Sequence, residues 1–327
     1  MQRAETFIGM TGDVAATARG IPYLCPHDRG VLVRLGSGDK LTCRSCARRY
    51  PIVRGIPILI NDDASVFQIA DYADGHAYGG ANYGNQADPA RGLRHFYRRS
   101  AVQIAGRWWW HGMSTAEAVA IIRAERPTAK ILVIGNGNDT CDGDVTYTDV
   151  AFGLNLDCIC DAHDLPFDSA SFDAVLAPCV LEHVADPQRC VTEIQRVLKP
   201  QGLVFAVTPF LEPVHMGAYD FTRFTPLGHR RLFRHFDEVR AGLALGPSAS
   251  VVWSAQSLLL SFSDNRNYRR IMRALSILLL FPLRLLDLLS RKSKTCYDSA
   301  GGTYFLGRKR ATPISDRDMI ALYRGAQ

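Results

Sequence analysis

Short apolar segments recur between residues 130 and 210, and this repeat constrains the fold of the 327-residue chain more than any other feature. The segments are ILVI (131–134), VTYTDV (145–150), DCIC (157–160), FDAVLAP (172–178) and LVFAVTPF (203–210). A helical pattern with a basic end, EIQRVLKP (193–200), stands between the last two. Strands that alternate with loops and helices predict a parallel sheet, because crossover connections place helices on both of its faces.

Glycine follows the first apolar segment directly. Gly135 and Gly137 flank Asn136, and glycines at this place let the backbone turn sharply and approach a ligand without interference from a Cβ atom. A dinucleotide fingerprint requires a third glycine at position 140, where this chain has Thr140. The loop therefore favours a cofactor other than a nicotinamide dinucleotide.

The second segment ends in Asp149, fourteen residues beyond Gly135. A carboxylate at the tip of a second strand can accept hydrogen bonds from both ribose hydroxyls of a nucleoside. The alternative is a solvated loop aspartate. The residue by itself does not decide between the two.

Four motifs then follow in order: D-A-x-D-L-P-F from Asp161, S-F-D-x-V from Ser171, L-E-H-V-x-D-P from Leu181 and E-x-x-R-V-L-K-P-x-G from Glu193. As an ordered set they resemble the class I S-adenosylmethionine-dependent methyltransferases, most closely the ubiquinone-biosynthesis-like branch with its type 11 methyltransferase domain. The resemblance implies an α/β fold with a Rossmann-like seven-stranded sheet and helices on both faces. It also implies methyl transfer from S-adenosylmethionine.

The same resemblance implies roles for individual residues near the cofactor. These are Gly135, Asn136 and Gly137 in the cofactor loop, Asp149 on the ribose, Asp161 with Ala162 at the adenine edge, and Cys179 near the methionine part. Two positions depart from the family pattern, since Val133 replaces an acidic residue and Asp139 replaces a third glycine. These departures leave open a second interpretation, a methyltransferase-fold binding or scaffold protein without activity.

A segment dense in His, Tyr, Asp and Arg follows the last apolar segment. It leaves the carboxyl end of a strand, where open α/β sheets bind ligands, so four side chains are candidates to hold a methyl acceptor and remove its proton. They are His215, Tyr219, Asp220 and Arg223. Neutral His215 suits the role of base, and Arg223 suits a carboxylate or phosphate. Alternatively, hydrogen bonds among these residues merely fix the loop, with Arg223 paired to Asp220.

Residues 21–60 read as short strands joined by turns, with half-sites of zinc-ribbon spacing at Cys25 and at Cys43 and Cys46. Asp28, with His27 beside it, stands where a fourth cysteine is expected. Zinc accepts either residue, so a Cys3Asp or Cys3His site and a metal-free module all remain open.

The segment resembles the zinc-ribbon-like activator subunits of methyltransferases, especially in YPIVRGIPILI (50–60). The resemblance implies a fused activator module that covers apolar surface on the catalytic domain.

These features divide the chain into a tail (1–20), the zinc-ribbon-like module (21–60), a polar linker or lid (61–90) and a methyltransferase domain (91–327) with a helical insertion at about 255–295. Trp108 to Trp110 either stack on a base or sugar or pack in the core.

The segment GGTYFLGRKR (301–310) predicts a closing edge strand. An odd number of cysteines and the lack of an apolar opening segment predict a reducing, cytoplasmic compartment.

Charge is distributed unevenly along the chain. Residues 1–110 carry a net charge of +5, residues 111–213 of −9 and residues 214–327 of +10. The acidic middle suits a cationic sulfonium cofactor, and the basic final third predicts an anionic acceptor or an anionic membrane surface. Small-molecule, lipid and glycan acceptors stay open. An RNA-modifying enzyme is a weaker alternative, because a protein that holds a nucleic acid along its length is expected to be basic throughout.

The most apolar stretch, Ile271 to Ser290, has basic residues at its borders and Pro282 inside. Its uninterrupted apolar run is too short to span a bilayer. It fits a helix that lies on anionic lipid. Packing on its own domain, or on a second copy of the chain, is the alternative.

Overall fold

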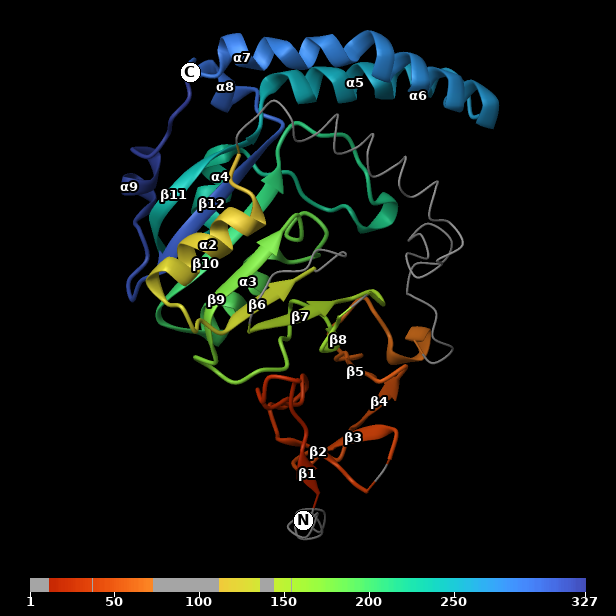
Figure 1. The fold of residues 1–327 in the computed structure, drawn as a ribbon, viewed down its shortest axis with the longest axis vertical. Helices are drawn as coiled ribbons and strands as arrows, with labels where there is room; N and C mark the ends of the chain where they lie inside the picture. Colours follow the sequence, from red (N-terminus) through yellow and green to blue (C-terminus); the bar gives the residue numbers. More distant parts are fainter. Residues whose placement is uncertain (1–11, 37, 73–111, 136–143, 154) are drawn as a thin grey trace. The chain divides into compact units, whose positions relative to one another are not determined.

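The computed structural model describes residues 12–36, 38–72, 112–135, 144–153 and 155–327 (Figure 1). Asn136, Gly137, Asp139, Thr140 and Trp108 to Trp110 lie outside the described residues. The chain divides into two units. The first comprises Met1–Asp88, Val119–Ala177 and Asp186–Val204, and the second comprises Pro89–Ala118, Pro178–Ala185 and Phe205–Gln327.

Four parallel strands form the centre of the first unit. They are β6 (Ile131–Ile134), β7 (Val145–Asp149), β8 (Cys158–Cys160) and β9 (Phe172–Pro178), and they lie in the order β8-β7-β6-β9. Every residue of β6 and β8 is buried, as expected for parallel strands covered on both faces. The apolar segments therefore form the strands that their pattern predicts.

Helix α2 (Thr115–Glu125) precedes β6 in the chain, and helix α3 (Pro187–Val197) follows β9. Asp186 caps α3, because its Oδ1 accepts a hydrogen bond from the N–H of Arg189 at 3.0 Å and Pro187 occupies the first turn. The buried face of α3 consists of residues three or four positions apart: Cys190, Val191, Ile194 and Val197 among them. This spacing is that of an amphipathic helix.

The amino-terminal strands belong to the same unit. They are β1 (Asp13–Val14), β2 (Leu32–Arg34), β3 (Lys40–Cys43), β4 (Arg49–Val53) and β5 (Ile56–Leu59), followed by the short helix η1 (Ile69–Tyr72). They pair antiparallel in sequence order. The turn between β4 and β5 places Arg54 and Gly55 at positive φ, as a tight hairpin requires. Strand β5 then pairs parallel with β8.

Strand β10 (Leu198–Pro209) begins in the first unit, next to β9, and continues into the second. There it is followed in the sheet by β12 (Gly302–Lys309) and then by β11 (Phe236–Leu245), an antiparallel pair. The prediction of a closing edge strand at 301–310 is therefore wrong in its position. Strand β12 lies between β10 and β11, and its first six residues are buried accordingly.

The sheet differs from the expected seven-stranded sheet with a separate β-rich module, because the described residues form one sheet of twelve strands. Seven of them come from residues 131–309 and five from residues 13–59. The physical reason is that β8 would otherwise be an exposed sheet edge, which proteins commonly cover. In this chain the amino-terminal module covers it.

Short helices complete the second unit: η4 (Gly217–Tyr219), α4 (Pro226–Leu232), α5 (Pro247–Ser261), α6 (Arg266–Leu280), η5 (Phe281–Leu285), α7 (Leu286–Ser290), α8 (Thr295–Asp298) and α9 (Asp316–Ile320). Phe233 stacks on Phe305 at a centroid distance of 5.3 Å and anchors α4 to β12. None of the helices in the described part of the chain is long and apolar enough to cross a membrane.

Candidate functional site

Three of the predicted cofactor residues stand at the carboxyl ends of neighbouring strands in the first unit. Gly135 follows β6 with a φ of +69°, and its N–H donates to the carbonyl of Thr148 at 2.9 Å. Asp149 ends β7, where its Oδ1 accepts a hydrogen bond from the N–H of Ala151 at 3.0 Å. Asp161 directly follows β8. The parallel sheet thus brings Gly135, Asp149 and Asp161 to one edge.

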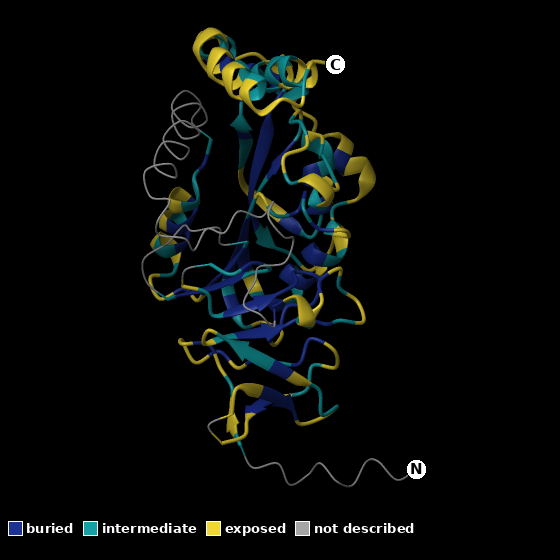
Figure 2. Cartoon of the chain, turned by 90° about the vertical axis from the view of Figure 1, so that its right-hand side faces the viewer, coloured by how far each residue is buried: buried dark blue, intermediate teal, exposed yellow. Residues whose placement is uncertain are grey.

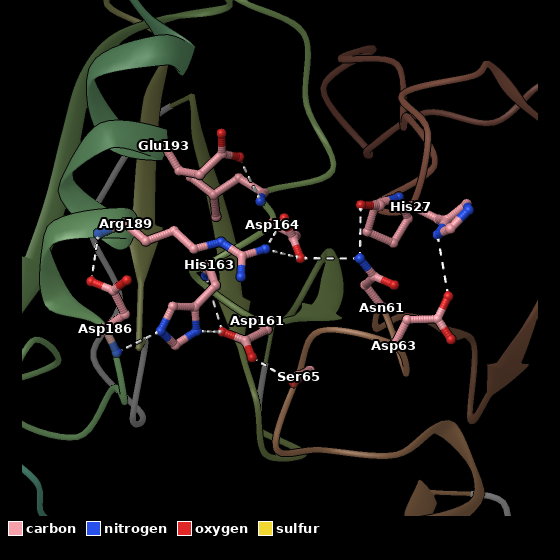
Figure 3. A network of polar contacts seen from close by, with 12 residues as sticks. His27, Asn61, Asp63, Ser65, Asp161, His163, Asp164, Asp186, Arg189 and Glu193 are labelled. Atoms are coloured by element: carbon pink, nitrogen blue, oxygen red, sulfur yellow. Dashed lines mark hydrogen bonds and ion pairs between the residues drawn. The ribbon is translucent and has the colours of Figure 1, made fainter.

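The carboxylate of Asp161 is buried, with 3% of the residue exposed, and it contacts protein groups on both sides (Figure 3). Oδ1 accepts from Nδ1 of His163 at 2.5 Å, and Oδ2 accepts from the hydroxyl of Ser65 at 2.5 Å. Burial opposes its ionisation, but these hydrogen bonds hold the pKa of Asp161 below its ordinary value. Ala162 is buried beside it.

His163 connects this carboxylate to helix α3. Its Nε2 accepts a hydrogen bond from the N–H of Asp186, the cap of α3, at 3.0 Å (Figure 3). With Nδ1 donating to Asp161 and Nε2 accepting, both ring nitrogens of a neutral imidazole are satisfied. Sequence reasoning missed His163 because it occupies the variable position of D-A-x-D.

Other motif residues tie the amino-terminal module to α3 within the first unit. Both carboxylate oxygens of Asp164 accept from Nη2 of Arg189 at 2.7 Å, and Asn61 donates to Oδ2 at 3.2 Å (Figure 3). Glu193 accepts from Arg29 of the module and from Arg196, each at 2.7 Å. Burial opposes ionisation of Glu193, and these two arginines hold its pKa below the ordinary value. Much of the motif set therefore has a structural role.

A second cluster lies in the second unit, where residues after β9 meet the loop that follows β10. Cys179 adopts a φ of +56°, and its N–H donates to the carbonyl of Val207 at 2.9 Å. Glu182 is fully buried, and burial raises its pKa to about 8. Nε2 of His183 lies 3.2 Å from Nε2 of His215. The predicted acceptor residue His215 thus belongs to a cluster with Glu182 and His183.

The remaining acceptor candidates surround His215. Nδ1 of His215 lies 3.4 Å from Oδ2 of Asp220, whose Oδ2 also accepts from Nη2 of Arg223 at 2.7 Å. Arg223 donates further to the carbonyls of Glu212 and Pro213. Tyr219 accepts from His183 Nδ1 through its main-chain oxygen at 2.9 Å. All four predicted residues lie in one cluster, with Arg223 engaged by its own loop.

The amino-terminal cluster contains Cys25, Asp28, Cys43 and Cys46, whose ligand atoms all lie within 4.8 Å of one another. The sulfur atoms of Cys25 and Cys46 are 3.7 Å apart, and sulfurs at about 2.3 Å from a tetrahedral zinc ion would be about 3.8 Å apart. A Cβ atom at Gly30 would lie 2.6 Å from the Cys43 sulfur. The cluster thus gathers three sulfur donors and one carboxylate, donor types that zinc accepts, and glycine at position 30 keeps a Cβ atom away from the Cys43 sulfur.

The neighbouring His27 points elsewhere, with its Nδ1 3.4 Å from Oδ2 of Asp63 (Figure 3). Of the two residues that the sequence offered as a fourth donor, Asp28 joins the cysteines and His27 does not join that cluster.

Among known families, a model described as a methyltransferase domain matches residues 142–206. A demethylmenaquinone methyltransferase of Clavibacter sepedonicus is 50% identical over 44 residues, which are 14% of this chain and 18% of the relative. A ubiquinone/menaquinone biosynthesis C-methyltransferase UbiE of Ralstonia nicotianae is 34% identical over 76 residues, which are 23% of this chain and 31% of the relative. The chain thus spans less than a third of the length of these relatives.

Comparison with solved structures matches a putative sarcosine dimethylglycine methyltransferase from Galdieria sulphuraria, at 14% identity and a TM-score of 0.37 over 67% of this chain and 88% of that one. Another is the complex between the Haloferax volcanii Trm112 methyltransferase activator and a putative methyltransferase. It shows 17% identity and a TM-score of 0.37 over 68% of this chain and 100% of that one.

Proposed function

We propose that this protein is an S-adenosylmethionine-dependent methyltransferase. The observation that carries the proposal is the methyltransferase-domain match over residues 142–206, which contains β7, β8, β9 and α3. Gly135, Asp149 and Asp161 end adjacent parallel strands beside or within this segment. The carboxyl ends of such strands are where open α/β sheets bind ligands.

Asp149 is the proposed ribose ligand, because a carboxylate at this strand end can accept from both hydroxyls of a diol. Gly135 keeps the first strand end open because glycine has no Cβ atom, and glycine adopts its φ of +69° without strain. Asp161 and Ala162 are proposed at the adenine edge, with His163 and Ser65 as positioning residues for the Asp161 carboxylate. When bound, the cofactor supplies an electrophilic methyl group on a sulfonium.

The cluster of His215, Tyr219, Asp220 and Arg223 is proposed to act on the acceptor. An acceptor that loses a proton as its new bond to carbon forms needs a nearby proton-accepting group, and a histidine suits that step near neutral pH. The substitution itself requires mainly alignment and exclusion of water.

We further propose that the acceptor is presented at an anionic lipid surface. Two of the similar proteins are named for the biosynthesis of ubiquinone and menaquinone, which supports the quinone class as the first acceptor to test. The helices α5 to α7 support a lipid surface, because much of their length is exposed (Figure 2) and many of the exposed residues are large and apolar.

In α6 and α7, Leu278, Leu279 and Leu289 are 72%, 67% and 84% exposed. The buried residues of the same region include the polar side chains of Ser276, Arg284 and Asp287. Asp287 accepts hydrogen bonds from the N–H and hydroxyl of Ser248 on α5, at 3.0 and 2.5 Å. Exposed leucines beside buried polar side chains are the reverse of the usual pattern, in which apolar side chains are buried and polar ones exposed. Basic residues border the apolar face: Arg266, Arg269, Arg270, Arg273, Arg291, Lys292 and Lys294. Apolar side chains with basic borders fit an anionic interface.

The zinc-ribbon-like cluster is proposed to bind a structural zinc ion through Cys25, Asp28, Cys43 and Cys46. Its support is the donor set and spacing, which match a closed tetrahedral site. A closed structural site contributes to folding and does not take part in the reaction.

The experiment incubates the full-length protein with S-adenosylmethionine labelled in its methyl group and with separate lipid, small-molecule, glycan and RNA fractions of a cell extract. Label in the lipid fraction supports the proposal, and label in RNA overturns the lipid assignment in favour of an RNA-modifying enzyme. Calorimetric titration with the cofactor is done in parallel. Absence of binding at millimolar cofactor would overturn the enzyme proposal and favour the scaffold alternative.

A further inference from the structure

The second unit contains a cluster whose chemistry neither the family match nor the similar proteins assign. Glu182 and His183 lie in the turn after β9, and His215 lies in the loop after β10. One ligand atom from each residue lies within 4.8 Å of the other two. The cluster is separate from the cysteine cluster near the amino terminus.

Glu182 is the first anomaly. The residue is fully buried, and neither carboxylate oxygen has a hydrogen-bond partner among the described residues. Burying a carboxyl group without partners is costly, and such groups in native proteins call for a physical explanation. The nearby cation Arg223 is already engaged by Asp220. The Glu182 oxygens therefore lack a compensating cation or donor, while Nε2 of His183 lies 3.8 Å from Oε1.

The two histidines are the second anomaly, because their Nε2 atoms face each other at 3.2 Å. Nδ1 of His183 lies 2.9 Å from the carbonyl oxygen of Tyr219, so this nitrogen carries the proton. Nε2 of His183 is then unprotonated and carries a lone pair, because the ring is neutral. Nδ1 of His215 faces Asp220 and Glu212 at 3.4 and 3.5 Å, which favours the same tautomer. Either a proton on Nε2 of His215 or a cation between the two rings is then required to account for the 3.2 Å contact.

The distances fit a metal ion in that place. Two nitrogens at about 2.0–2.1 Å from a tetrahedral zinc ion are about 3.3 Å apart. The observed separations are 3.2 Å between the two Nε2 atoms and 3.8 Å between His183 Nε2 and Glu182 Oε1. The outer nitrogens contact a carbonyl and carboxylates, which is how metal-binding histidines are usually oriented.

We propose that Glu182, His183 and His215 bind a divalent transition-metal ion, with zinc as the best match to two imidazoles and one carboxylate. Three protein ligands leave a coordination position for water or for an anionic oxygen of a bound molecule. A metal-bound hydroxyl loses its proton more readily. When the ion is bound, Nε2 of His215 is a ligand and no longer a base, so the metal-bound oxygen would take over the loss of the proton. Metal binding itself stands apart from methyl transfer, and only the use of the ion on an acceptor rests on the proposed function.

A bridging proton is the competing arrangement. Nη2 of Arg223 lies 3.4 Å from Nδ1 of His215, so Arg223 could donate there and leave a proton on Nε2 of His215 to bridge to His183. This arrangement holds no metal and leaves Glu182 without a partner. A direct measurement of metal content separates the two.

The experiment strips the full-length protein with a chelator, reloads it with cobalt(II) and measures bound metal together with the absorption spectrum. The cysteine cluster, if loaded, shows thiolate-to-cobalt charge transfer, whereas a His2Glu site shows ligand-field bands alone. We expect the His183→Ala/His215→Ala double variant to bind one equivalent of cobalt less and to lose only the part of the ligand-field absorption that titrates without charge transfer, while the charge-transfer band of the cysteine cluster stays. Glu182→Gln should weaken metal binding at this site at least about tenfold.

His235→Ala is the matched control, because His235 lies in the same unit outside the cluster. Circular dichroism checks that each variant is folded, and the conservative Glu182→Gln variant keeps the test valid if the double variant unfolds. Equal cobalt affinity of the non-thiolate site in the wild type and Glu182→Gln would overturn the proposal, as would a wild type without the non-thiolate component. Cofactor titration of the same samples reports on the proposed function separately.

Discussion

Ile58 of β5 is paired in parallel register with Ile159 of β8, so the amino-terminal module extends the parallel sheet of the first unit. This pairing covers the edge of β8. Side chains reinforce it, because Arg29 donates to Glu193 on α3 and to the carbonyl of Leu165. The module is thus attached both by main-chain pairing and by ion pairs to motif residues.

Replacing Arg29 should weaken this attachment. Arg29→Ala removes two hydrogen bonds, one of them to the buried carboxylate of Glu193, and should lower the free energy of unfolding by about 1–2 kcal/mol. Urea unfolding measures the change. The control is Arg34→Ala on the exposed end of β2, for which we expect a change within about 0.5 kcal/mol. Equal effects of both variants would contradict a specific role for Arg29.

Stability should fall in acid because of Asp161 and Glu193. Both have folded-state pKa values below their ordinary values. Each therefore contributes stability that is fully present above its unfolded pKa of about 4 and is lost as the pH falls through the lower folded pKa. Urea midpoints measured from pH 6 down to pH 3 test this. Asp161→Asn should flatten the decline below about pH 4, and an unchanged slope would show that Asp161 does not contribute.

Asp149→Ala should weaken binding of S-adenosylmethionine about tenfold or more, because it removes the proposed acceptor for the ribose hydroxyls. Asp149 lies at a strand end and is not part of the core, so the unfolding midpoint should change little. Calorimetry measures both the wild type and the variant. Asp168→Ala, an exposed change in the same unit, should bind the cofactor like the wild type. Unchanged affinity in Asp149→Ala would place the ribose elsewhere.

The amino-terminal cluster of Cys25, Asp28, Cys43 and Cys46, proposed above to bind zinc, can be tested with two neighbouring substitutions. Asp28→Ala removes a donor that lies 3.3 Å from the Cys43 sulfur, and it should abolish the thiolate-to-cobalt charge-transfer band or weaken metal binding strongly. His27→Ala should leave the band unchanged, because His27 faces Asp63. If His27→Ala lost the metal and Asp28→Ala retained it, the ligand set would be Cys3His.

Sequence reasoning succeeds here where one local pattern decides the outcome. The apolar runs at 131–134, 145–149 and 172–178 are buried parallel strands because their composition alone favours that state. It fails where the partner of a residue is distant in the chain. No local sequence pattern indicates that β5 pairs with β8 or that β12 lies between β10 and β11. None indicates that His163 connects Asp161 to the start of α3. Glu182 likewise reads as an ordinary motif acid, and its lack of partners emerges from tertiary packing.

The reversed burial of α6 and α7 predicts binding to anionic vesicles. Leu278→Asp/Leu289→Asp places two charges on the exposed apolar face and should strongly reduce co-flotation with vesicles that contain phosphatidylglycerol. Each buried leucine contributes about 1.5–3 kcal/mol when it leaves water, so the loss should exceed tenfold. Ile320→Asp is the control, since Ile320 is 69% exposed on α9 and should not alter binding. Binding of the wild type should also fall with salt, because anionic lipid attracts the basic border electrostatically. Equal flotation of wild type and double variant, or wild-type binding to uncharged vesicles alone, would contradict an anionic membrane surface.

A concentration-dependent dimer that the double variant abolishes would instead assign this face to a second copy of the chain.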